Sequence, residues 1–427
     1  MKVYLEKVHI MNYKAIDKIY IDLQPGINLL IGDNGAGKTS VLEGIAVALS
    51  GLFVNVAGVS TKNFVKEDAR MIINSLGDAS TSVTYCEPIL AGCSLKICDG
   101  KDFQWCRFKE EMSEPHTKID DKAVCMWMKK LTNQTDSILP LVSYQSAART
   151  WKARRGDFGT ELQKKLDDRR CGYIGCLDYS MHVKAIQQWC MKQEITVVNK
   201  GKVREYETFK SIISTFMKEI NELDETPEVY YSPQFGELAY KDSKEDMAIS
   251  KLSAGYQSLL WMIMDLAYRV CLLNPELSDR SQINGIVLID EIDMHLHPKW
   301  QWNIIKAFST TFENVQFIIA THSPIVISSA KETNLILLDE EQGVTYLPEC
   351  YGYAVEDVLC YRQESMSRPK NVKVLIDQII ESVDDENFND AEKALVKLKN
   401  ILGEDNSEFK KMAGVVEDAK MIWGVDT

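Results

Sequence analysis

The sequence predicts an α/β fold in which a parallel or mixed sheet is covered by helices and joined by an antiparallel β lobe. Residues 286–289 and 317–320 are short, continuously apolar runs, as in parallel strands that are buried on both faces. Alternating apolar and polar residues near the N-terminus predict antiparallel strands instead. Helical periodicity in the middle and at the end of the chain adds a short helical insertion and a helical C-terminal tail.

The bulk composition is that of a soluble globular protein. The 427 residues carry a net charge of −13, and 45% of them are hydrophobic, an ordinary share for a chain with a real core. No apolar run approaches the roughly 18 residues that span a bilayer, and the charged N-terminus is unlike a signal peptide. Eleven cysteines without a C-x-x-C pair favour free thiols over a zinc site. We therefore expect a cytoplasmic protein with no membrane partner.

The order of the expected elements suggests four parts. Before residue 156 we expect a hairpin at 3–23, a buried strand at 27–31, a helix at 40–50, a β-meander at 82–108 and a strand at 138–144. Later come a helical stretch at 209–223, a small hairpin at 229–240, a nearly all-apolar helix at 258–273 and three amphipathic helices at 372–383, 394–402 and 409–419. The predicted boundaries are 1–155 and 246–350 for two parts of one head, 156–245 for a mainly helical insertion, and 351–427 for a tail that contacts a partner or another copy.

Residues 32–39 fit the pattern G-x-x-x-x-G-K-[ST], between an apolar strand and an amphipathic helix. Glycines let successive backbone N–H groups point at phosphate oxygens, and the following helix adds its positive end. Lys38 is expected to reach the β- and γ-phosphates, and the Thr39 hydroxyl to ligate Mg²⁺. The pattern thus predicts an ATP site made by Asn34, Gly35, Ala36, Gly37, Lys38, Thr39 and Ser40.

A second buried strand, residues 285–289, ends in Asp290 and Glu291. Acidic residues at the carboxyl end of a parallel strand lie where such sheets place their chemistry. We expect Asp290 to hold Mg²⁺ and Glu291 to act as general base on the attacking water. A separate metal cluster formed by residues 293–297 is the less favoured alternative. His322, which ends the strand at 317–321, is expected to sense the γ-phosphate by hydrogen bonding.

The hexapeptide Leu-Ser-Ala-Gly-Tyr-Gln at residues 252–257 resembles the signature motif of ABC-type ATPases, and the order of all the motifs matches that family. The resemblance implies a P-loop ATPase head in which Ser253, Gly255 and Gln257 contact ATP bound to a second subunit. ATP would then be sandwiched in a dimer. Gln145, after the strand at 138–144, is a candidate for the family's Q-loop residue, which contacts Mg²⁺ and the attacking water. A surface glutamine is the alternative.

Within that family the chain resembles the SMC and RecF-like heads, because a hairpin precedes the phosphate loop. It is most similar to overcoming-lysogenization-defect-like and PtuA-like ATPases over residues 290–323 and in the helical tail. This resemblance implies a role in defence against phage, beside a separate effector such as a nuclease. The insertion lacks the sustained heptads of an SMC arm, and the tail lacks the acid-tipped strands of a Toprim nuclease.

Three functions remain open on the sequence. The first is a defence ATPase that senses or regulates, forms an ATP-sandwiched dimer or a higher oligomer, and holds an effector protein. The second is a RecF-like clamp that binds DNA through a basic groove containing Arg149, Lys152, Arg154 and Arg155; the acidic surface fits a protein partner better. The third is an ATP-bound scaffold with little turnover, against which the intact Glu291 argues.

Overall fold

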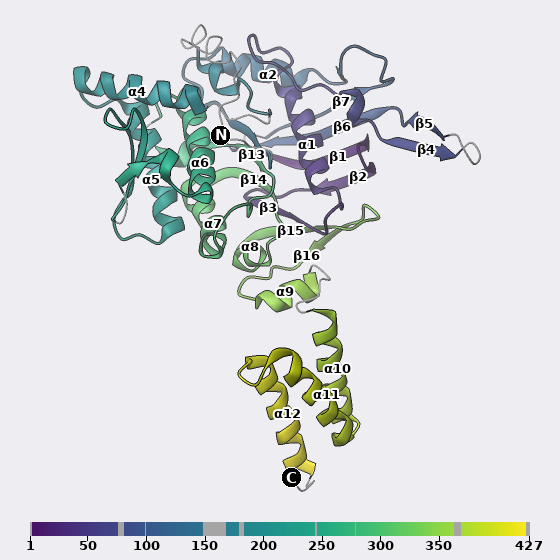
Figure 1. Ribbon diagram of the computed structural model, residues 1–427. Helices are drawn as coiled ribbons and strands as arrows, with labels where there is room; N and C mark the ends of the chain where they lie inside the picture. Colours follow the sequence, from purple (N-terminus) through teal and green to yellow (C-terminus); the bar gives the residue numbers. More distant parts are fainter. Residues whose placement is uncertain are drawn as a thin grey trace. The chain divides into compact units, whose positions relative to one another are not determined.

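The computed structural model describes residues 2–75, 81–98, 100–147, 168–178, 183–243, 246–277, 279–362 and 369–423. The chain divides into two compact units, Met1–Val355 and Glu356–Thr427. Figure 1 shows the elements of both units. Among the described residues, no helix has both the length and the apolar character needed to cross a membrane.

A six-stranded sheet forms the centre of the first unit. Its strand order is β16-β15-β3-β14-β13-β9, and only β16 runs antiparallel to its neighbour. The strands are β3 (Ile27–Ile31), β9 (Leu141–Gln145), β13 (Asn284–Ile289), β14 (Asn314–Ala320), β15 (Thr333–Leu338) and β16 (Val344–Leu347). Every residue of β3 and β13 is buried. This confirms the parallel strands that the continuous apolar runs predicted, whereas β15 and β16 were not anticipated.

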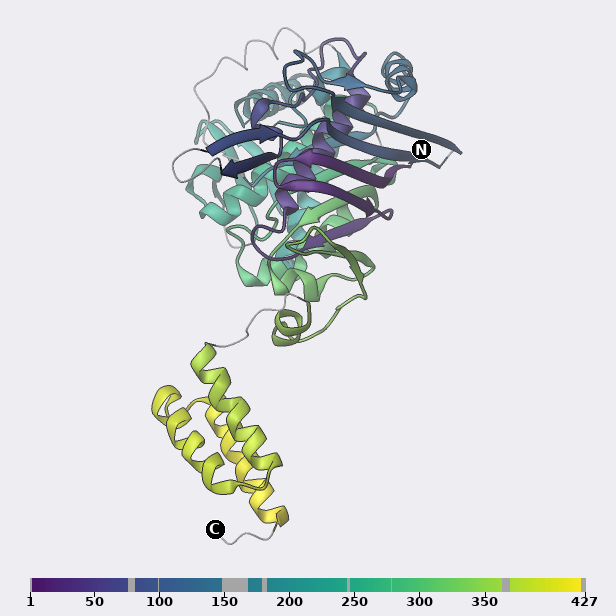
Figure 2. The ribbon, with the colours of Figure 1, turned by 90° about the vertical axis from the view of Figure 1, so that its right-hand side faces the viewer.

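A second, antiparallel sheet has the order β2-β1-β6-β7-β8. Its strands are β1 (Val3–Tyr13), β2 (Ile16–Asp22), β6 (Ile89–Ile97), β7 (Lys101–Lys109) and β8 (Lys118–Ile119), which confirms the predicted hairpin and meander. Helix α1 (Lys38–Leu49) contacts strands of both sheets, and Figures 1 and 2 show it beside them. Tyr13 is fully buried and packs against Phe64, so it belongs to the core.

The insertion contains both helices and strands. Helices α4 (Val183–Lys200) and α5 (Arg204–Asn221) are followed by a small sheet of β10 (Glu228–Ser232), β11 (Glu237–Lys241) and β12 (Asp246–Ala248). The predicted hairpin at 229–240 is therefore confirmed and extended by a third strand. Helix α6 (Ala254–Leu273) follows and is buried along nearly its whole length, as its apolar sequence predicted.

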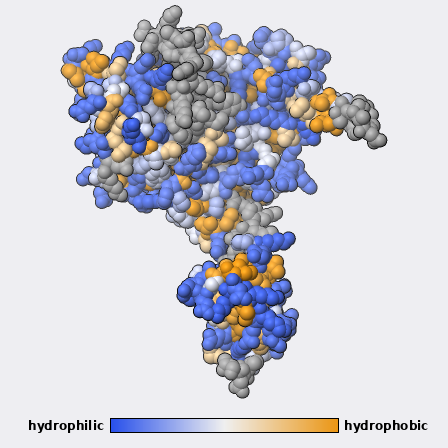
Figure 3. Space-filling view, in the orientation of Figure 1, coloured by the Kyte–Doolittle hydropathy of each residue, from blue (hydrophilic) through white to orange (hydrophobic). Residues whose placement is uncertain are grey.

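The remaining helices of the first unit lie on its surface and around the sheets. They are α2 (Ala123–Thr132), α7 (Pro298–Thr311) and α8 (Pro324–Ser329), with short 3₁₀ helices at Ser50–Phe53, Lys66–Asp68, Arg169–Tyr173, Ile249–Lys251 and Arg280–Gln282. Strands β4 (Met71–Ser75) and β5 (Thr81–Tyr85) form a separate hairpin. Its side chains Met71, Ile73 and Val83 are exposed, and they give the orange patch beside the grey atoms at the right of Figure 3.

The second unit is a cluster of three helices, α10 (Lys370–Asp384), α11 (Phe388–Leu402) and α12 (Ser407–Trp423). These confirm the three amphipathic helices that the periodicity predicted. Their own small core includes Ile379, Ala391, Leu398 and Met412. Helix α9 (Val355–Arg362) spans the boundary between the units in the sequence.

Candidate active site

The phosphate loop connects the buried strand β3 to helix α1. Gly32, Gly35 and Gly37 have φ values of 142°, 96° and 89°, a region that side chains rarely adopt. At Gly32 a Cβ would lie 2.1 Å from the carbonyl oxygen of Leu338. The loop therefore requires glycine at its first position both for its backbone angle and for the close approach of β15.

Lys38 is the first residue of α1, and its side chain folds back onto this loop. Its Nζ donates hydrogen bonds to the carbonyl oxygens of Gly32 and Asp33 at 2.8 and 2.7 Å, and the residue is 5% exposed. Burial lowers the pKa of Lys38, and the carboxylates of Asp33 and Asp290 oppose that effect. The structure thus holds a buried cation at the point where the sequence predicted phosphate binding.

Asp290 and Thr39 bring the two predicted motifs together. The Thr39 hydroxyl lies 3.1 and 3.0 Å from the two carboxylate oxygens of Asp290, although 251 residues separate them in sequence. Asp290 is 1% exposed, and its backbone N–H donates to the carbonyl of Gln145 at 2.8 Å. Oxygen donors that converge in this way suit a hard divalent cation.

Glu291 and His322 complete one side of the same cavity. This cavity has a volume of about 250 Å³, and Glu291 enters it from a backbone with φ 44°, a conformation that costs of order 1–3 kcal/mol for a non-glycine residue. Burial lowers the pKa of His322, with the charge of Lys38 acting in the same direction. The backbone N–H of His322 donates to Asp293 Oδ1 at 3.4 Å, and the Thr321 hydroxyl donates to the same oxygen at 2.5 Å.

Most of the predicted nucleotide residues line this cavity. It contains Asn34, Gly35, Gly37, Lys38, Thr39, Ser40, Asp290, Glu291 and His322. Ala36 is buried in the loop, where its N–H donates to Asp33 O at 3.2 Å, and it is not part of the lining. Ala15, in the turn between β1 and β2, lines the cavity but was missed. No local signal marked Ala15, because strands β2 and β3 separate it from the phosphate loop in the sequence and only the fold brings the hairpin turn to that loop.

Gln145 does not lie at the phosphate loop. It is the last residue of β9 and is 3% exposed. Its Nε2 donates to Ser143 Oγ at 3.0 Å and to Asp265 Oδ2 at 2.9 Å, on helix α6. Because its amide faces the core, we correct the sequence-based expectation: Gln145 is left out of the proposed metal and water site. Its contribution there is its backbone carbonyl, which fixes Asp290.

The signature residues begin helix α6. Ser253 is exposed, and its hydroxyl caps the helix by accepting from Tyr256 N at 3.4 Å. A Cβ at Gly255 would lie 2.3 Å from His295 O, so glycine is needed where this helix meets the segment after β13. Gln257 donates to Leu252 O at 2.7 Å. The described lining of the phosphate cavity includes none of Ser253, Gly255 and Gln257.

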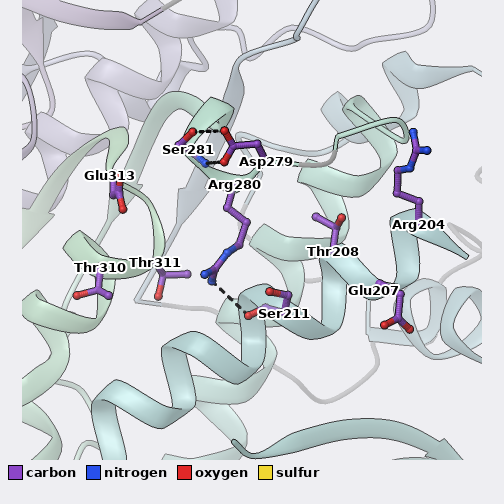
Figure 4. Close-up of a pocket in the computed structure, with 10 residues that line it drawn as sticks. All are labelled: Arg204, Glu207, Thr208, Ser211, Asp279, Arg280, Ser281, Thr310, Thr311 and Glu313. Atoms are coloured by element: carbon purple, nitrogen blue, oxygen red, sulfur yellow. Dashed lines mark hydrogen bonds between the residues drawn. The ribbon is translucent and has the colours of Figure 1, made fainter. Parts of the chain in front are cut away.

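A larger cavity, of about 590 Å³, lies away from these motifs (Figure 4). Its lining comes from α5, from the residues just before β13 and from the end of α7, so it is at the opposite end of β13 from Asp290. Figure 4 shows Arg280 reaching toward Ser211, to whose carbonyl it donates at 3.5 Å. Its mixture of three carboxylates, two guanidinium groups and hydroxyls selects no single ligand class.

Two further features of the sequence analysis are a candidate metal cluster and a basic stretch. Within the part of the chain that the structure describes, no three His, Cys, Asp or Glu side chains are grouped to hold a metal ion, so residues 293–297 form no such cluster. The basic stretch at 149–155, on which the DNA-binding alternative depended, lies outside the described residues.

A family model described as an AAA domain matches residues 7–260 of the chain. The match covers more than half of the sequence, and the chain belongs to this family of AAA domain proteins. A second AAA domain model matches residues 204–328. Membership of this AAA domain family implies that the chain binds a nucleotide.

Three curated proteins are similar over most of their lengths. The retron Vc95 probable ATPase of Vibrio cholerae serotype O1 biovar El Tor is 25% identical, covering 79% of this chain and 74% of that protein. The retron Ec83 probable ATPase of Escherichia coli is 25% identical, and the match covers 98% of this chain and 87% of that protein. The Septu protein PtuA of Bacillus thuringiensis is 24% identical, covering 94% and 95%. The predicted resemblance to PtuA-like ATPases is therefore confirmed.

Solved structures with a similar arrangement include an SMC head bound to the C-winged helix domain of ScpA. It has a TM-score of 0.48 and 15% identity, and the match covers 81% of this chain and 98% of that one. The structure of the recombination mediator protein RecF has a TM-score of 0.44 and 15% identity, and the match covers 81% of this chain and 99% of that one.

Proposed function

We propose that this chain is an ATP hydrolase that pairs with a second copy around bound ATP and serves as the sensor or regulatory ATPase of a bacterial anti-phage defence system. One observation carries the proposal. Lys38, Thr39, Asp290, Glu291 and His322 share a single cavity, whereas the signature helix begins outside that cavity. One chain thus brings the phosphate loop, the two carboxylates and His322 together. The signature motif that the sequence predicts at the same ATP would come from a second chain.

In this proposal the loop amides and Lys38 bind the β- and γ-phosphates at the positive end of α1. Thr39 and Asp290 would hold Mg²⁺, which neutralises charge on the phosphates. Glu291 would take a proton from the attacking water, because it lines the cavity beside these groups. His322, whose lowered pKa keeps it neutral near pH 7, would hydrogen-bond to the γ-phosphate.

The second copy would supply the missing half. Ser253 is exposed at the start of a 20-residue helix, and a helix N-terminus is an anion site. We infer that this end of α6 meets the γ-phosphate of the partner's ATP. Binding of ATP would then hold two chains together, and hydrolysis would release them.

The second unit would contact the effector or further copies. Its helices expose large apolar side chains, and the three at the end of α12 are 57–80% exposed: Met421, Ile422 and Trp423. Figure 3 shows orange patches among the blue surface of this unit. Clustered exposed apolar residues are typical of interaction sites. The similarity to retron and Septu proteins supports a separate effector, such as a nuclease, as the partner.

The test is ATP turnover and oligomer mass for the wild type and for Glu291→Gln. We expect turnover to fall by roughly 10²–10⁴-fold, the usual contribution of a general base, and an ATP-dependent dimer or larger assembly to accumulate. Lys38→Ala is the control, since it should lose both ATP binding and assembly. Wild-type turnover in Glu291→Gln, or a mass that ignores ATP in both proteins, would leave a nucleotide-bound scaffold as the better description.

A further inference from the structure

Asn221, the last residue of helix α5, joins two segments that are distant in sequence. Its Nδ2 donates to the Tyr256 hydroxyl at 3.0 Å, and its Oδ1 accepts from Trp300 Nε1 at 2.9 Å. Tyr256 belongs to the signature motif, and Trp300 is the third residue of α7. The nitrogen and the oxygen of the Asn221 amide therefore connect the insertion to α6, which precedes β13 in the sequence, and to α7, which follows it.

The two partners of Asn221 also contact each other. The rings of Tyr256 and Trp300 have centroids 4.7 Å apart and an interplanar angle of 89°, an edge-to-face arrangement that aromatic pairs favour. Next to them, the first turn of α6 at Gly255 lies directly against His295 O. The signature motif and the segment of residues 293–297 before α7 are thus held as one surface.

The end of α5 is itself fixed on α7. Ion pairs join Lys299 to Glu222 at 3.0 Å and Lys306 to Glu219 at 2.9 Å. Asn303 Nδ2 donates to the carbonyl of Ile220 at 3.2 Å. These contacts hold the C-terminal end of α5 on α7, and they therefore fix the position from which Asn221 bonds to Tyr256 and Trp300.

We propose that Asn221 is a positioning residue through which the insertion keeps the signature motif and residues 293–297 in the arrangement that engages ATP on a second copy. The proposal rests on the pairing stated under the proposed function. Asn221, Tyr256 and Trp300 are absent from the described lining of the phosphate cavity. Their loss should therefore weaken pairing and leave ATP binding by a single chain unchanged.

The chain offers a matched control. Asn221 and Asn303 are both half-buried and both connect α5 to α7, but only Asn221 contacts the signature motif. In a Glu291→Gln background with ATP, we expect Asn221→Leu to weaken the pairing affinity roughly tenfold, as for the loss of a hydrogen-bonded partner. Asn303→Leu should pair within about twofold of the parent. Both should bind a fluorescent ATP analogue like the parent at low protein concentration.

A second measurement does not depend on pairing. Hydrogen exchange of the amides of residues 256–258 in unpaired protein should be about tenfold faster in Asn221→Leu and unchanged in Asn303→Leu. Trp300→Phe keeps an aromatic ring and removes the Nε1 donor. It takes the place of Asn221→Leu if that variant folds poorly, and it should also make exchange at residues 256–258 faster.

The outcomes separate the two proposals. If the parent does not pair with ATP but the exchange difference appears, the pairing model fails and the positioning role of Asn221 in the signature motif stands. If exchange at 256–258 is the same in Asn221→Leu, Trp300→Phe and the control, the positioning role is wrong, whether or not the parent pairs. Equal pairing affinities for Asn221→Leu and Asn303→Leu would also overturn it.

Discussion

The ion pair between Asp265 and Arg269 allows a quantitative test of how helix α6 is packed. The Arg269 Nε lies 2.9 Å from Asp265 Oδ2, and the two side chains are 5% and 2% exposed. Arg269 also donates to the carbonyls of Gly172 and Ile174 at 3.0 and 3.1 Å. Replacing Asp265 by leucine leaves a buried guanidinium without its counter-charge, which costs roughly 3–5 kcal/mol of folding free energy.

Removing the second charge should restore part of that loss. In Asp265→Leu/Arg269→Met no charge remains buried. The residual cost is that of polar groups left without partners, namely the carbonyls and the Gln145 amide, about 1–3 kcal/mol for each such group. We therefore expect the double variant to be more stable than Asp265→Leu alone. Urea unfolding followed by circular dichroism measures both values. A double variant that is less stable than the single one would show that the charge of Arg269 is not the source of the cost.

Three further predictions concern the phosphate site. Gly32→Ala should weaken binding of a fluorescent ATP analogue more than tenfold, because its Cβ would lie 2.1 Å from Leu338 O; normal binding would show that β15 can move away. Thr39→Val should raise the Mg²⁺ concentration needed for half-maximal turnover, since it removes a hydroxyl beside Asp290; an unchanged Mg²⁺ requirement contradicts this role. Burial holds the pKa of His322 in the folded state below the ordinary histidine value of 6.5, so the unfolded state binds more protons as pH falls through that value, and stability should drop there. Melting temperatures between pH 7.5 and 5.5 should show a smaller drop for His322→Gln, and an equal drop would exclude His322 as its source.

Sequence patterns predicted those elements whose own residues show which side chains are buried. Examples are the apolar runs of β13 and β14 and the glycine loop at residues 32–39. Each has a local sequence pattern, and the tertiary fold agrees with it. The same holds for the tail, where each helix carries its own apolar face and the three form a separate core. For the site, Lys38, Thr39 and Asp290 were predictable because each motif fixes both residue type and position relative to a strand end.

The direction of side chains at strand ends was not predictable. Gln145 was expected just after a strand and is the last residue of β9, where its pairing with Ile289 and the neighbouring α6 decide that its amide points to Asp265. Asp265 and Arg269 had a usable signal, because they are an acid and a base four residues apart in an otherwise apolar helix. Asn221 had none, because both of its partners are brought to it only by the tertiary fold.

The turn between α4 and α5 has a consequence for how relatives of this chain diverge. Gly201, with φ 81°, sits in that turn among exposed residues, whereas the other end of α5 is anchored at Asn221. Extra residues at the turn would lengthen the α4–α5 helix pair without rotating Asn221. One residue inserted within α5 near its C-terminal end would turn that side chain by about 100° around the helix axis. The length of the α4–α5 pair can therefore vary at the turn, whereas the rotation of α5 about its axis is constrained at Asn221.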